Sequence, residues 1–338
     1  MNSRERVIRA IEMRKPDRLP ITHSTLPGAF LRHGKKLLEL YSRYPSDVLS
    51  PRYESATMAS EEYGPKIGVG SRDRWGAVWV RLTDYHKGQV VEHPLDDWSK
   101  LSTYKFPKPL GWPEFEIVEK AMKEDRGEHY VLVDGDTLWQ RIFYLRGMKN
   151  ALIDLMMDRK ELYILRDGIL DYILVRVEKW TSMGVDGIQF RDDWGTQDRM
   201  MIRPSLWREF FKPAYAEMFR AAHKGGAHVH FHSDGMIKPI IPDLIEIGVD
   251  VLNLQLGVMS IQDLGREFGG KVCFHGGVDR QRILPRGSVK DVENHVREIV
   301  EAFGKFNGGY IGGGEVGADV PLENVEAMLR TFWSYRYT

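Results

Sequence analysis

The sequence predicts an α/β protein, and at 338 residues the class that fits it best is a single (β/α)8 barrel. From residue 128 onward, short apolar segments alternate with longer segments of helical periodicity. The short segments are apolar on both faces, as strands of a parallel sheet covered by helices are. Charged side chains directly follow several of them, at the strand ends where barrels build their sites. A doubly wound open sheet is the alternative fold.

The first 127 residues predict one helix and a long irregular stretch. Asn2 to Met13 has an N-cap residue and an apolar face, which predicts a helix. Strand patterns follow at Asp47–Ser50 and at Trp75–Val80, and the latter pairs with Gln89–Glu92 as a small hairpin laid on the main domain. No repeat or low-complexity segment marks a boundary. We therefore expect one domain over residues 1–338, with an N-terminal part (1–127) and a main run (128–338).

The main run predicts the alternating elements of the barrel in order. The expected strands are 130–133, 186–190, the histidine-rich stretch after Gly226, 249–254, 271–275 and 309–312. The expected helices are 148–157, 160–183, segments across 204–223, 237–247, the stretch from Ser288 to Gly304, and a last helix beginning at Pro321.

Composition narrows the class of function. Hydrophobic residues make up 42% and charged residues 28%, and 48 basic side chains balance 48 acidic ones. A formal net charge of zero does not favour binding to nucleic acid or to an anionic membrane. The single cysteine, Cys273, excludes an intrachain disulfide and a thiolate zinc site. The chain begins with a charged helix instead of an apolar signal, so we expect a cytoplasmic protein acting on a small molecule.

The histidine-rich stretch is the first candidate site. His228, His230 and His232 alternate, so on a strand they share one face, and Asp234 continues the series past the strand end. Imidazoles ending in a carboxylate at a strand end can hold a metal ion or carry protons. A buried strand with hydrogen-bonded core histidines is the alternative. For three histidines with one aspartate, we favour a site.

The other strand ends add further groups that would share the barrel mouth. Those groups are Asp192, Asp193, Trp194 and Gln197 after one strand, His275 after another and Glu315 after the last. His, Asp and Glu from separate strands suit a catalytic zinc ion with three protein ligands and one open position. For Asp192 and Asp193 the alternative is a helix cap and a solvated turn, since adjacent carboxylates on an extended backbone cannot both point inward. His275 could contact substrate instead of metal.

Several motifs resemble the uroporphyrinogen decarboxylase superfamily along nearly the whole chain. They are Ser3-Arg-Glu-Arg-Val-Ile-Arg-Ala-Ile11, Pro16-Asp-Arg-Leu-Pro20, Asp192-Asp-Trp-Gly195, His232-Ser-Asp-Gly235, Ile245-Glu-Ile-Gly-Val-Asp250, His275-Gly-Gly-Val-Asp279 and Asp319-Val-Pro-Leu-Glu-Asn324. The resemblance implies a (β/α)8 barrel. It also implies either a haem-pathway decarboxylase or a zinc-dependent methyltransferase that works with a corrinoid protein.

Departures from the family patterns favour the methyltransferase branch. The decarboxylase carries an arginine-rich signature near its N-terminus and a Gly-His-Gly near its C-terminus, whereas this chain has residues 22–28 without arginine and Gly312-Gly-Gly-Glu315. A polycarboxylate substrate would lack its bidentate cations. The coenzyme M methyltransferases use His-x-Cys-Gly and a late cysteine as zinc ligands. Here His232 and Asp234, and within one residue Glu315, take those positions, so the resemblance implies that these three are metal ligands.

Replacing sulfur by oxygen predicts a different methyl donor. Ligation by His, Asp and Glu leaves zinc a harder Lewis acid suited to oxygen, so we expect an O-methyl donor such as an aryl methyl ether. The methyl group would pass to the corrinoid of a partner protein, with zinc, Asp193 or His275 assisting the departing oxygen. The residues expected to contact the donor are Trp139, Tyr144, Trp194, Gln197 and Tyr310. The resemblance also favours a homodimer.

Two other functions stay open at this stage. One is a decarboxylase or related lyase without a cofactor, which would use the same carboxylates and histidines as proton donors on a non-porphyrin acid. The other is a ligand-binding barrel without catalysis. For His230, one layer deeper than His232, we expect either a role in orienting a metal ligand, worth roughly 10–100-fold in affinity, or a core histidine bonded to a neighbouring strand.

Overall fold

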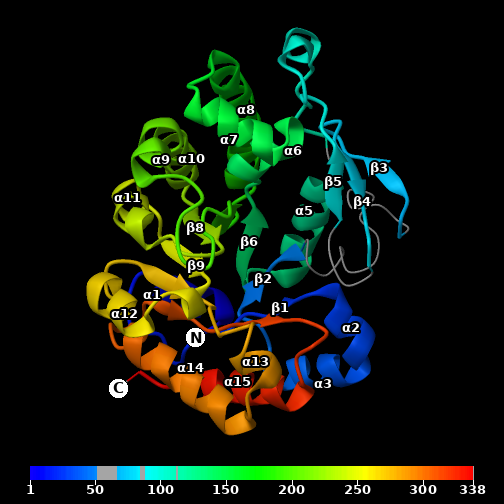
Figure 1. Cartoon of the computed structure of the whole chain (residues 1–338). Helices are drawn as coiled ribbons and strands as arrows, with labels where there is room; N and C mark the ends of the chain where they lie inside the picture. Colours follow the sequence, from blue (N-terminus) through cyan, green and yellow to red (C-terminus); the bar gives the residue numbers. More distant parts are fainter. Residues whose placement is uncertain (52–66, 84–87, 112, 338) are drawn as a thin grey trace.

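The computed structural model describes residues 1–51, 67–83, 88–111 and 113–337 and shows a parallel sheet curled inside a layer of helices (Figure 1). Within these ranges the main sheet has the order β11-β10-β9-β8-β7-β6-β2, with every pair parallel. The parallel strands are β1 (Ser24–Thr25), β2 (Val48–Leu49), β6 (Tyr130–Asp134), β7 (Gly187–Arg191), β8 (His228–Ser233), β9 (Val251–Leu254), β10 (Cys273–His275), β11 (Tyr310–Ile311) and β12 (Glu315–Val316).

An extended segment, residues 20–25, closes the sheet between its two edge strands. On one side Thr22 N donates to Gly312 O at 2.8 Å, just past β11. On the other side Asp47 N, just before β2, donates to Ile21 O at 2.7 Å. The end of the segment, β1, pairs in parallel with β12. The segment takes the place of the remaining strand of the barrel, and the predicted (β/α)8 class is confirmed.

Helices cover the outside of this barrel. Figure 1 shows α14 and α15 on the opposite side of the molecule from α7 and α8. No helix in the described ranges is long and apolar enough to cross a membrane. The helices of the main run are α6 (Trp139–Arg146), α7 (Met148–Met156), α8 (Lys160–Ser182), α9 (Pro204–Phe210), α10 (Lys212–Lys224), α11 (Ile241–Glu246), α12 (Ile261–Phe268), α13 (Ile283–Arg286), α14 (Val289–Phe303) and α15 (Leu322–Ser334), with 3-10 turns η3 (Lys238–Ile240) and η4 (Leu256–Val258).

The apolar residues form two clusters, as the alternation of strand side chains requires. A large cluster joins outward-facing strand residues such as Val229 and Phe231 to the surrounding helices. A smaller cluster fills the floor of the barrel, where Val7 and Ile11 of the first helix, α1 (Ser3–Ile11), pack against Val251. This helix caps the amino-terminal ends of the strands, so the open end of the barrel is the carboxyl-terminal one, where the polar strand ends gather.

The N-terminal part is more helical than the sequence predicted. The hairpin is confirmed and has a third antiparallel strand, but the expected long irregular stretch is wrong. Its helices are short or bury few residues: Gly34, with φ of 51°, separates α2 from α3, and α5 buries only Phe115 and Val118. The elements of this part are α1 (Ser3–Ile11), α2 (Pro27–His33), α3 (Lys35–Arg43), β3 (Gly70–Arg72), β4 (Val78–Val80), β5 (Gln89–Glu92), the 3-10 turn η2 (Trp98–Thr103) and α5 (Pro113–Asp125).

A buried carboxylate, Asp47, holds the closing segment to the floor of the barrel. Its side chain has no exposed surface, and Oδ1 accepts from Arg6 Nη1 at 2.7 Å and from Ser3 Oγ at 2.7 Å. Oδ2 accepts from Arg18 Nη1 at 2.7 Å and from Ile21 N at 2.9 Å. These charge-assisted bonds tie α1, the closing segment and β2 together.

Replacing Asp47 with Asn should lower the free energy of unfolding by about 3–5 kcal/mol, because two buried guanidinium groups would lose their shared counter-charge. Denaturant unfolding followed by circular dichroism measures the loss. Asp167→Asn is the matched control, since Asp167 is 57% exposed in its pair with Arg166 and its replacement should change stability by less than about 1 kcal/mol. Equal effects of the two variants would contradict the role given to Asp47.

Candidate metal centre at the barrel mouth

The inner face of β8 carries the three histidines. His228, His230 and His232 point into the barrel, whereas Val229 and Phe231 are fully buried among the outer helices. The predicted alternation is therefore confirmed. His232 lies at the carboxyl end and is about one quarter exposed, whereas His230, one layer below it, is 1% exposed. Only the last histidine of the series is open to the mouth.

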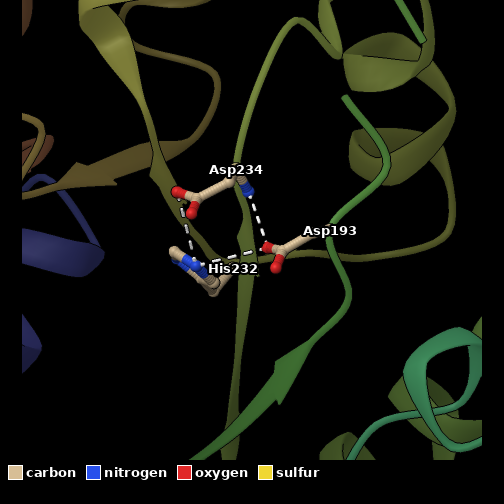
Figure 2. A group of neighbouring side chains, drawn as sticks. All are labelled: Asp193, His232 and Asp234. Carbon is tan, nitrogen blue, oxygen red and sulfur yellow. Dashed lines mark hydrogen bonds and ion pairs between the residues drawn. The ribbon is translucent and has the colours of Figure 1, made fainter. Parts of the chain in front are cut away.

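Two carboxylates flank His232, as Figure 2 shows. Asp193 comes from the loop after β7, and Asp234 directly follows β8. His232 Nε2 lies 3.6 Å from Asp193 Oδ1 and 3.8 Å from Asp234 Oδ1, distances too long for hydrogen bonds. Asp193 Oδ1 also accepts from Asp234 N at 2.9 Å, and its Oδ2 accepts from Gln140 Nε2 at 3.0 Å. The three side chains therefore converge without a hydrogen bond between any two of them.

The spacing of the triad Asp193–His232–Asp234 fits a small divalent cation. One donor atom from each side chain lies within 4.8 Å of the others. Tetrahedral zinc with bonds of about 2.0–2.2 Å sets its ligand atoms roughly 3.3–3.6 Å apart. The observed 3.6 and 3.8 Å need only a small contraction to reach that geometry. Each side chain is one quarter to one third exposed, so an ion could enter from solvent.

Glu315, expected as the third ligand, lies outside this triad. Its Oε1 accepts from Arg280 Nη1 at 2.7 Å, and Arg280 Nη2 donates to Asp234 Oδ2 at 2.6 Å. The guanidinium thus joins Glu315 to Asp234, and the third member of the triad is Asp193, from the loop after β7. Glu315 and Asp234 outweigh the effect of burial and raise the pKa of Arg280. Two carboxylates, Asp234 and Glu315, therefore share one guanidinium, and Asp193 makes no ion pair with Arg280.

His275 ends β10 at the level of the triad, with Asn253 of β9 between it and His232. Burial, and then the neighbouring His232, lower the pKa of His275 to about 4. Its imidazole is therefore neutral at neutral pH and has one N–H group that can donate a hydrogen bond. Its Nδ1 is buried without a hydrogen-bond partner among the described residues.

Asp192 points away from the mouth, unlike its neighbour Asp193. It is fully buried, and its carboxylate accepts from Leu138 N at 2.9 Å, from Gln140 N at 2.8 Å and from Tyr215 Oη at 2.6 Å. It caps the first turn of α6. A helix cap is the role that the sequence offered for Asp192 as the alternative to catalysis. Burial raises the pKa of Asp192 to about 7, against the lowering effect of these hydrogen bonds.

His230 is bonded below the triad to a side chain of β6, two strands away in the sheet. Its Nε2 lies 2.9 Å from Tyr130 Oη, and Tyr130 Oη in turn donates to Asp186 O. Burial, with His275 and His228 nearby, lowers the pKa of His230 well below the usual value. No hydrogen bond joins His230 to His232 in the described residues, and His230 Nδ1 is buried without a partner there. His230 is therefore a core histidine, but its partner lies on β6 and not on an adjacent strand as expected.

Three of the aromatic residues expected to contact substrate are packed in the core. Trp139, Trp194 and Tyr310 have no exposed surface. The first two stack with ring centroids 5.2 Å apart, and Tyr310 Oη donates to Gly276 O. Tyr144 is half-buried and packs edge-on against Trp79. These rings therefore support the wall of the barrel.

Gln197 is exposed on the loop after β7 and lies next to an open cavity of about 740 Å³. The cavity is lined by the loops after β7 and β8, including Arg199, Met236 and Lys238. None of the triad residues lines it. It is a surface hollow beside the mouth and separate from the triad.

Comparisons with known proteins agree with this architecture. The family model described as Uroporphyrinogen decarboxylase (URO-D) matches residues 80–335. Among solved structures, a methyltransferase from Methanosarcina mazei superposes with a TM-score of 0.72 at 16% identity, covering 98% of each chain. A B12-independent methionine synthase from Shewanella sp. W3-18-1 gives a TM-score of 0.48 at 12% identity, covering 88% of this chain and 84% of that one. No curated protein sequence matches. The chain belongs to the uroporphyrinogen decarboxylase (URO-D) family.

Proposed function

We propose that this protein is a methyltransferase that binds Zn²⁺ at Asp193, His232 and Asp234 and passes a methyl group from an O-methyl donor to the corrinoid of a partner protein. The observation that carries the proposal is the convergence of one imidazole and two carboxylates at the barrel mouth, at ligand spacing and without bonds to one another. The likeness in fold to the Methanosarcina methyltransferase supports the reaction class.

The donor atoms favour an oxygen leaving group. The single cysteine, Cys273, is fully buried in the floor of the barrel, and burial raises the pKa of its thiol. No thiolate can therefore join the triad. When bound by one nitrogen and carboxylate oxygens, zinc is a hard Lewis acid that stabilises negative charge on a departing alkoxide or phenoxide. The C–O bond would break with its electron pair on that oxygen, and a reduced Co(I) corrinoid on the partner would supply the electron pair for the new bond to the methyl carbon.

The remaining residues position this chemistry. Gln140 Nε2 and Asp234 N hold the Asp193 carboxylate in place. With Asp193 assigned to the metal, His275 is the group left to hydrogen-bond the departing oxygen, and it does so as a neutral donor. Arg280 holds the Glu315 carboxylate beside the site, and the opposite charges of these two side chains balance each other. An aryl methyl ether is the donor we propose, because it places a stabilised phenoxide at this position.

A decarboxylase is the second candidate, because the matching family model carries that name. A substrate with several carboxylates would need free cations at the mouth. Arg191 is bonded there to Asp134 at 2.6 Å, and Arg280 is bonded to Asp234 and Glu315. Both guanidinium groups are already neutralised, which favours the methyltransferase.

The triad variants test the metal centre. His232→Ala, Asp193→Asn and Asp234→Asn should each weaken Zn²⁺ binding by more than about 100-fold, beyond the range usual for residues that only orient a ligand. His230→Ala and Glu315→Gln should change the affinity by less than about tenfold, because neither side chain belongs to the triad. Competition with a chromogenic chelator measures all five. Loss of binding in Glu315→Gln with retention in Asp193→Asn would restore Glu315 as the ligand.

The reaction itself is tested by reconstitution. With a reduced corrinoid protein and an aryl methyl ether, we expect formation of the methylated corrinoid, measured by its absorption spectrum, together with release of the phenol. Removal of metal by a chelator should abolish turnover, and one equivalent of Zn²⁺ should restore it. Carbon dioxide release from an aryl acid by the metal-free protein would favour the decarboxylase. Donor binding without turnover by any reconstituted partner would favour a ligand-binding barrel.

A further inference from the structure

Asn253 is the polar residue of β9 that stands between two strands of the site. The parallel register places it opposite His232 on β8 and opposite His275 on β10. Its side chain makes one hydrogen bond to each neighbour. Asn253 Nδ2 donates to His275 O at 2.8 Å, and Asn253 Oδ1 lies 2.7 Å from His232 Nδ1.

The bond to His275 fixes which way the amide faces. A backbone carbonyl only accepts, so the NH₂ group must point at β10 and Oδ1 must point at β8. Turning the amide over would place two oxygens against each other. Gly276 leaves room for this orientation, because a Cβ at that position would lie 3.0 Å from Asn253 Nδ2. The strand register therefore sets the direction of the side chain before any ligand is bound.

The amide direction then sets the proton on His232. Since Oδ1 can only accept, the ring nitrogen opposite it, Nδ1, must carry the hydrogen. A neutral imidazole has one N–H, so Nε2 is left with a lone pair. That lone pair faces Asp193 Oδ1 at 3.6 Å and Asp234 Oδ1 at 3.8 Å, both of which also only accept. Three acceptors facing one another are satisfied by a cation.

We propose that Asn253 is a positioning residue that holds His232 as the Nδ1–H tautomer and so keeps Nε2 free as a metal donor. The bond that it makes is the one ligating histidines commonly donate to an oxygen outside the coordination sphere. The metal-binding part of this inference rests on the proposed function. The tautomer itself does not, because it follows from hydrogen bonds that are present without an ion.

Nitrogen NMR of metal-free protein with labelled histidine, recorded at several pH values, tests the tautomer of the neutral imidazole directly. The signals of His232 are assigned among the eleven histidines by their loss in His232→Gln. We expect a protonated Nδ1 and an unprotonated Nε2. Asn253→Leu should give a mixture of tautomers. Asn253→Asp loses the bond to His275 O but keeps an acceptor for His232, so it should retain Nδ1–H. Gln255→Ala is the control, since that amide accepts from Gly235 N and does not touch the ring.

Zn²⁺ titration of the same variants supplies the second readout. Asn253→Leu should bind about 10–100-fold more weakly than wild type, and Asn253→Asp and Gln255→Ala should stay within about tenfold. A wild-type His232 protonated on Nε2 would overturn the proposal, and so would an unchanged tautomer and affinity in Asn253→Leu. If the leucine variant does not fold, the wild-type and aspartate spectra still decide. The expected tautomer without zinc binding would overturn the proposed function and leave the role of Asn253 in the tautomer intact.

Discussion

The closure of the barrel at Asp47 is the constraint on which the rest of the structure depends. Its buried carboxylate joins α1, the segment at residues 20–25 and β2 through bonds to Arg6, Arg18 and Ile21. Because the sheet is closed, the carboxyl ends of its strands meet at one mouth, and loops distant in sequence share one site. An open sheet would separate the end of β12 from the end of β8 and the triad would lose the neighbouring Arg280–Glu315 pair.

Closure also explains how one strand serves both stability and chemistry. The outward residues Val229 and Phe231 are fully buried against helices, and the inward histidines descend from the open mouth to the apolar floor. His232 at the mouth faces carboxylates, and His230 below it is bonded to Tyr130. The same residue type therefore has two roles, decided by depth along the barrel. Adjacent Asp192 and Asp193 divide in the same way, one capping a helix and the other facing the mouth.

Much of the architecture could be predicted from the sequence because the βα units carry strong local signals. The alternation of β8 predicted the shared inner face of its histidines, and the stripe after Ser288 predicted α14. The third triad member could not be predicted, because Asp193 or Glu315 is chosen by the guanidinium of Arg280, which only tertiary packing places. Asn253 gave a weak signal, a polar residue on the inner face of an otherwise apolar strand. The missed helices α2, α3 and α5 show the other limit, because each of them buries only two residues and none carries an apolar stripe as long as that of α14.

The central claim is that Asp193, His232 and Asp234 form a metal centre, and anomalous diffraction at the zinc edge from crystals grown with Zn²⁺ tests it most directly. The account predicts one strong peak bonded to His232 Nε2 and to an oxygen of each aspartate. A peak bonded to Glu315 or His275 in place of Asp193, or no peak at the mouth, would contradict it.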